Sequence, residues 1–169
     1  MVWRGRNSPK DRFFAALVYV LPLIEVMGFG SFLFLELPFL QPIFAIPLSP
    51  FLLVYSPLER SIPFFGLIVF FVLLLTVVRN DRIVHFIRFN TMQAILLTIF
   101  TSLCEALLQL FGLGDRLTNL SSPLTWGVLF SIIFIAVVSA SIYAIVQSAR
   151  GLYAEVPLIS DAAYSQVRY

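Results

Sequence analysis

Long apolar runs alternate with short polar segments along this chain, and the runs predict membrane-spanning helices. A helix that crosses a bilayer needs roughly 20 mainly apolar residues. Four stretches have about this length, and they cover approximately Phe13–Leu35, Ile62–Val78, Thr91–Phe111 and Leu124–Val146. The predicted fold class is therefore an all-α membrane protein with four transmembrane helices. Because these helices take up half of the 169 residues, we expect one polytopic membrane domain over residues 1–169.

The composition excludes several classes of protein and several kinds of site. The chain is 60% hydrophobic and 12% charged, with a mean hydropathy of +0.96, whereas ordinary soluble domains carry about 25% charged residues. It lacks the polar surface of a disordered or soluble protein and the basic surface of a nucleic-acid-binding domain. One cysteine and one histidine exclude an internal disulfide, a multi-cysteine metal site and a bis-imidazole site. We expect no enzyme activity, no cofactor, no metal and no nucleic-acid partner.

The basic residues are distributed unevenly between the predicted helices. Four lie before the first helix, three between the second and third, and two in the C-terminal tail 147–169, which leaves one in each of the other two segments. The positive-inside rule then places both termini on the cytoplasmic side, or on the stromal side of a plastid membrane. The basic start resembles a secretory signal, but the apolar run continues to about Leu35 without an A-x-A pattern, so we expect a retained first helix.

The segment between the first two predicted helices, residues 36–61, is apolar but rich in proline. Because proline lacks an N–H and clashes inside a helix, we expect no single continuous helix here. Such an apolar outer loop lies in the membrane interface or folds back over the bundle, as a linker, a lid or a docking surface. Its prolines are Pro38, Pro42, Pro47, Pro50 and Pro57.

Helical periodicity continues through the segment Arg79–Arg88, between the second and third predicted helices. Ile83, Phe86 and Ile87 share one face, and charged residues lie elsewhere. This pattern predicts a short amphipathic interfacial helix between spans 2 and 3, whose arginines reach anionic lipid headgroups.

Polar side chains follow one face of the third predicted helix. A rotation of about 100° per residue places four of them near Glu105, whereas Ile95 and Leu103 lie on the opposite face. Such a stripe faces protein or water rather than lipid, so it either makes contacts within the bundle or lines a polar path. Glu25, close to the middle of the first helix, needs a partner or water for the same reason. The candidate residues are Glu25, Thr98, Thr101, Ser102, Glu105 and Gln109.

Small residues recur every four positions in the fourth predicted helix, at Ala136, Ala140 and Ala144, followed by Ser148. A row of this kind lets another helix approach closely. The neighbour is either a helix of the same chain or a second copy in a homo-oligomer.

Two short motifs carry a resemblance to a known family. The first is Val78-Arg79-Asn80, and the second is RFNTMQAILL from Arg88 to Leu97. Together they resemble the signature of the twenty-kilodalton subunit of the chloroplast inner-envelope protein translocon, the Tic complex, and of its cyanobacterial homologues. Similar features extend from about Arg12 to the C-terminus and include EVPLISD from Glu155 to Asp161. The acidic residue that often follows the Leu-Leu pair in that family is Thr98 here.

The resemblance implies a channel-forming or channel-associated membrane subunit of a preprotein translocation complex. The partners that it implies are other membrane translocon subunits and preproteins in transit. The implied location is the cyanobacterial inner (plasma) membrane, or the plastid inner envelope for an organelle-encoded member. Because no transit peptide is seen, we expect a cyanobacterial or plastid-encoded member and not a nuclear-encoded one. The residues alone leave two other functions open: a non-conducting scaffold or assembly factor for another membrane complex, and a small solute or proton transporter using Glu25 and Glu105.

The signature lies where the predicted interfacial helix meets the third span. We expect Asn90 to cap the start of that span, Arg88 to lie at headgroup depth, and Gln93 to need a partner from another helix. This junction is predicted to fix the fold or, alternatively, to contact a partner protein. Its residues are Arg79, Asn80, Arg88, Phe89, Asn90 and Gln93.

Overall fold

The computed structural model describes residues 8–111, 124–157 and 159–167, and the regular structure of these residues is entirely helical. Four helices are long and apolar enough to cross a membrane: Pro9–Glu36, Leu40–Ser61, His85–Leu110 and Trp126–Ala149. The predicted all-α class with four such helices is confirmed. The first, third and fourth agree with the expected spans, but the second is a different segment from the expected one.

The first span is a series of short helical segments: α1 (Pro9–Leu17), α2 (Val20–Glu25), the 3₁₀ segment η1 (Val26–Gly30) and α3 (Ser31–Glu36). Ser8 and Asp11 form a capping box at its start. Pro22 has no N–H for the carbonyl of Val18, which accepts from the N–H of Leu21 at 3.3 Å instead. The break between α1 and α2 therefore follows from the proline.

Residues Leu40–Ser61 form one helix, α4, so the expectation that the prolines prevent a continuous helix is wrong. Pro50 leaves the carbonyl of Ile46 without its usual N–H donor, and the hydroxyl of Ser49 donates to that carbonyl at 2.7 Å. Pro42 lies in the first turn, where helical N–H groups have no partner in any case. The pattern of prolines alone does not show that a side-chain hydroxyl can replace the backbone N–H that proline lacks.

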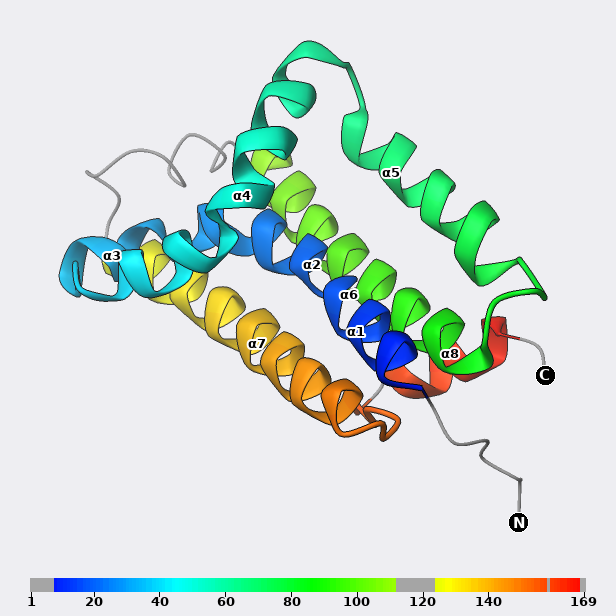
Figure 1. Cartoon of the computed structure of the whole chain (residues 1–169). Helices are drawn as coiled ribbons and strands as arrows, with labels where there is room; N and C mark the ends of the chain where they lie inside the picture. The colour runs from blue at the N-terminus through cyan, green and yellow to red at the C-terminus, as the bar shows by residue number, and fades with distance from the viewer. Residues whose placement is uncertain (1–7, 112–123, 158, 168–169) are drawn as a thin grey trace.

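The α4 helix runs across the direction of the other long helices (Figure 1). The chain then turns back through α5 (Phe65–Leu73), which continues as one π-helical segment, η2 (Leu74–Val78). This apolar segment is shorter than the four long helices and begins three residues after the expected start at Ile62. In Figure 1, α5 descends on one side of α6 and returns the chain to the end where α6 begins.

The expected amphipathic helix over Arg79–Arg88 is not a separate element. Turns occupy Arg79–Val84, and α6 (His85–Leu110) is one uninterrupted helix of 26 residues. Its first turns do not rest on lipid, because Phe89 packs against Tyr164 of the C-terminal helix α8 (Ile159–Gln166), with ring centroids 4.4 Å apart. Phe86, from the apolar face that indicated a membrane-surface helix, is buried and packs edge-on against Tyr153 of the C-terminal segment, with ring centroids 5.2 Å apart.

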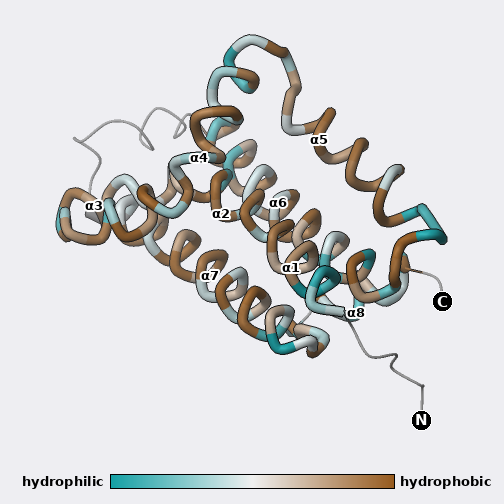
Figure 2. Tube along the Cα trace, viewed as in Figure 1, coloured by the Kyte–Doolittle hydropathy of each residue, from teal (hydrophilic) through white to brown (hydrophobic). Residues whose placement is uncertain are grey.

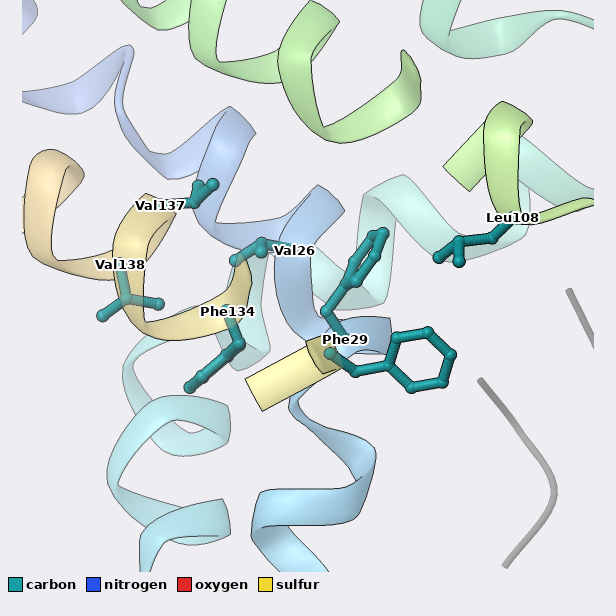
Figure 3. Packing of buried hydrophobic residues seen from close by; sticks show 7 residues of the cluster. Val26, Phe29, Leu108, Phe134, Val137 and Val138 are labelled. Atoms are coloured by element: carbon teal, nitrogen blue, oxygen red, sulfur yellow. The ribbon is translucent and has the colours of Figure 1, made fainter. Parts of the chain in front are cut away.

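The first span, α6 and α7 (Leu124–Ala149) pack against one another at the centre of the molecule. Figure 3 shows part of this core, where Val26 and Phe29 meet Phe134 and Val137 of α7, with Leu108 of α6 at its edge. Each of these side chains is buried. Figure 2 shows hydrophobic residues along all the long helices, with hydrophilic residues gathered in the turn between α5 and α6.

The small-residue row of α7 is only partly covered. Ala144 and Ser148 are buried, and Ala144 belongs to a cluster with Tyr19 of the first span, whereas Ala136 is exposed. One end of the row therefore packs within the chain. A homo-oligomer through the exposed end stays a prediction.

The end of α7 generates a first testable prediction. Gly151 has a φ of +78°, and a Cβ at this position would lie 2.8 Å from Nε of Arg12. The left-handed conformation costs a residue with a side chain about 1–2 kcal/mol, so Gly151→Ala is expected to lower the free energy of unfolding by at least that amount. Gly28→Ala is the control, because a Cβ there meets nothing within 4 Å. Thermal unfolding in detergent measures both, and equal midpoints would contradict this interpretation.

Candidate functional site: a buried polar junction and an open groove

Asn90 and Gln93 of α6 form the centre of a buried polar junction. The hydroxyl of Tyr19 lies 2.9 Å from Oδ1 of Asn90 and 2.8 Å from Oε1 of Gln93. Ser148 of α7 donates to Oδ1 of Asn90 at 2.8 Å, and Nε2 of Gln93 donates to the carbonyl of Ala154 at 2.7 Å. All five residues have 0% exposure. The junction thus connects the first span, α6, α7 and the segment after α7.

The protons of this junction can be assigned by counting donors. Tyr19 has one hydroxyl proton and two acceptors in reach, and Ser148 donates to one of them, Asn90. Tyr19 therefore donates to Gln93. Nδ2 of Asn90 donates to the carbonyl of Phe86 at 2.8 Å. With this assignment both amide oxygens have a donor, and each amide nitrogen has an acceptor.

The structure changes the account of two signature residues, Asn90 and Arg88. Asn90 does not cap a helix start, because α6 begins at His85 and Asn90 lies inside it. Arg88 is only 7% exposed; its Nε donates to the carbonyl of Val78 at 2.8 Å, and its Nη1 lies 3.2 Å from Asp81. Carbonyls at the end of a helical segment lack intrahelical donors, so Arg88 joins the end of η2 to α6.

The other signature residues shape the turn between η2 and α6. Oδ1 of Asn80 accepts from the backbone N–H of Arg82 at 3.0 Å, which is the local bond that favours asparagine in turns. Arg79 is exposed, and Phe89 is fully buried against Tyr164. Gln93, which was expected to need a partner from another helix, contacts Tyr19 and Ala154.

An open groove of about 550 Å³ lies between α5 on one side and α2 and α6 on the other. Most of its wall is apolar. The polar groups in the wall come from Glu25 of α2, Glu59 of α4, and Thr98 and Ser102 of α6. Thr98 and Ser102 were predicted from the polar stripe, whereas the participation of Glu59 required knowledge of α4.

The predicted polar stripe does not follow one surface. Thr101 is buried and donates to the carbonyl of Leu97, and Ser102 is exposed. Gln109 and Glu105 pair with each other, with Nε2 of Gln109 3.2 Å from Oε1 of Glu105.

Ile95 and Leu103 were predicted on the opposite face from the stripe, but both line the groove with Thr98 and Ser102. Helical periodicity orders residues around α6, but it does not show which side α5 covers. The centre of the groove wall is displaced around α6 from Glu105.

Glu25 has a partner that the sequence analysis missed. The hydroxyl of Tyr55 on α4 donates to Oε1 of Glu25. Gly66, at the start of α5, lies beside both groups, since a Cβ there would be 3.7 Å from Oε1 of Glu25 and 3.8 Å from the Tyr55 hydroxyl. The ring of Tyr55 meets Phe65 edge-on at a centroid distance of 5.2 Å. This contact connects α2, α4 and α5 at one end of the groove.

The donor count in the junction generates a second prediction. Ser148→Ala leaves one Tyr19 proton for the amide oxygens of Asn90 and Gln93, so one of these buried acceptors loses its donor. An unsatisfied buried acceptor costs about 1–3 kcal/mol, and we expect a lower unfolding midpoint in detergent. The control is Ser139→Ala, the same substitution at an exposed position of α7. If both variants unfold like the wild type, the proton assignment is wrong.

The chain is similar to known proteins over nearly its whole length. Residues 7–163 match the family model described as chloroplast import apparatus Tic20-like. A Tic20 family protein of Synechocystis sp. is 45% identical over 165 residues, which cover 95% of this chain and 94% of that protein. No solved structure matches.

Two more distant relatives come from Arabidopsis thaliana and Gracilaria tenuistipitata. Protein TIC 20-II, chloroplastic, of Arabidopsis thaliana is 30% identical over 93% of this chain and 72% of its own length. The Tic20 family protein Ycf60 of Gracilaria tenuistipitata is 32% identical over 93% of this chain and 75% of its own length. With the four apolar helices, these relatives identify a multi-pass protein of an inner membrane or envelope. The chain belongs to the Tic20 family, whose family model is described as chloroplast import apparatus.

Proposed function

We propose that this chain is an integral membrane subunit of a preprotein translocation complex and that its groove provides one wall of the path. The family relationship supports the general role, since the matching family model is described as chloroplast import apparatus. The proposal that the groove forms one wall of the path rests on the open side of the molecule between α5 and α6.

The α5 helix contributes Gly66, Leu67 and Phe70 to the wall of the groove. None of its residues is buried, although it is among the most apolar segments of the chain. Opposite α5, the wall on α6 offers Thr98 and Ser102 between apolar residues. A segment of polypeptide in this space would meet apolar side chains and a few hydrogen-bonding groups, which suits sequences of varied composition.

The core of the first span, α6 and α7 is a poor place for the path. Tyr19 and Phe130 are fully buried there, and Phe134 is 1% exposed. Opening a passage would break the polar junction and expose unpaired amide groups to a medium without water. We therefore propose a channel-associated role, in which other subunits complete the path on the open side.

A non-conducting scaffold is the second candidate, and the same closed core favours it. In a scaffold, the groove side would contact membrane subunits and not a chain in transit. The two candidates differ in which molecule lies beside α5.

Site-specific photo-crosslinking separates the two roles. A photoreactive amino acid replaces Leu67, which lines the groove on α5, or Leu107, which lies outside it on α6; the two side chains are 57% and 54% exposed. Membranes that contain the complete complex and a preprotein arrested in transit are then irradiated. We expect crosslinks to the preprotein from position 67 and not from position 107. Crosslinks from position 67 to neighbouring subunits alone would support the scaffold, and equal preprotein crosslinking from both positions would contradict a specific groove.

A further inference from the structure

A polar pocket of about 380 Å³ lies where η2 ends, α6 begins and α8 passes by. It is separate from the groove in its lining residues, and its walls are mainly polar. The residues that line it are Val78, Arg79, Asp81, Arg88, Ser165 and Gln166.

Two arginines line this pocket, and they differ in burial: Arg88 is buried and Arg79 is exposed. Arg88 has a side chain that is 9% exposed, and its contacts with Val78 and Asp81 fix it in place. These contacts leave further N–H donors of its guanidinium unused. Arg79 is exposed, and no acidic side chain of residues 8–111, 124–157 or 159–167 forms an ion pair with it.

The charge balance of the pocket favours an anion. Asp81 also lines the pocket and would repel an anion, but its carboxylate lies 3.2 Å from Nη1 of Arg88 and forms an ion pair with it. Since Asp81 neutralises Arg88, the pocket lining keeps a net positive charge from Arg79. Gln166 adds an amide from α8, and Ser165 adds a hydroxyl that is engaged with the carbonyl of Ala162 at 2.7 Å.

The position along the chain indicates which anion this is. The apolar segment Phe65–Val78 ends at the pocket, so the pocket lies at the depth where hydrocarbon gives way to headgroups, as arginines at span ends do. Guanidinium groups bind phosphate through paired, charge-assisted hydrogen bonds. We propose that this pocket binds a phosphate group between Arg79 and Arg88, carried by an anionic lipid headgroup or free in the aqueous phase.

Thermal unfolding of the full chain in detergent tests the proposal. Phosphatidylglycerol, phosphatidylcholine and inorganic phosphate are the probes. Each probe is added in increasing concentration to the wild type, to Arg79→Gln and to Arg82→Gln. Arg82 is the matched control, because it is also exposed and lies outside the pocket. A charge-assisted contact contributes about 1.5–3 kcal/mol, so Arg79→Gln should weaken the apparent affinity about tenfold or more, and Arg82→Gln should leave it unchanged.

The outcomes distinguish the source of the phosphate. Stabilisation by phosphatidylglycerol that exceeds stabilisation by phosphatidylcholine and is lost in Arg79→Gln supports the site with a lipid ligand. Stabilisation by inorganic phosphate with the same dependence on Arg79 supports the site with a soluble ligand. Equal responses of the three proteins to every probe would overturn the proposal. Gln166→Glu, which adds a carboxylate to the wall, is a second variant and should abolish the response if the pocket binds an anion.

Discussion

The structure depends on one constraint, which is that a polar group buried among membrane helices must find its hydrogen-bond partner inside the protein. Asn90 and Gln93 of α6 meet this requirement only when Tyr19, Ser148 and the carbonyl of Ala154 are in place. Because these partners come from three other segments, the two amides determine the relative positions of those segments. Apolar packing alone would tolerate sliding of one helix along another, whereas these hydrogen bonds do not.

This arrangement divides the molecule into a closed side and an open side. The first span, α6 and α7 share a filled core with the polar junction at one end, and the C-terminal segment folds over the beginning of α6. By contrast, α4 buries only Leu48 and α5 buries no residue. The contact between Glu25 and Tyr55 is a polar link from the closed side to α4. Function that requires movement or access is therefore best placed at the groove beside α5, and the phosphate pocket lies at the other end of that same segment.

Sequence reasoning found the elements whose signal is local. Three of the long helices and the requirement of Gln93 for a partner followed from hydropathy and polarity. The α4 helix was missed because the cost of proline was judged without the hydroxyl of Ser49, which serves the carbonyl freed by Pro50. The interfacial helix was wrongly expected because the apolar face that includes Phe86 has the same sequence pattern whether lipid covers it or, as here, Tyr153 of the C-terminal segment packs on it. Tyr19 is far from Asn90 and Gln93 in sequence, so periodicity within one helix could not connect them. The side of α6 that faces the groove likewise depends on where α5 lies.

A double-mutant cycle between Tyr19→Phe and Gln93→Leu tests the central claim most directly. The free energy of unfolding in detergent is measured for the wild type, both single variants and the double variant, and a second cycle pairs Tyr19→Phe with Thr98→Val, which lies outside the junction. If the hydrogen bond between Tyr19 and Gln93 holds the first span against α6, the first cycle should give a coupling energy of about 0.5–3 kcal/mol and the second cycle a value close to zero. Additive effects in the first cycle would contradict the account, because they would show that the two side chains stabilise the fold independently.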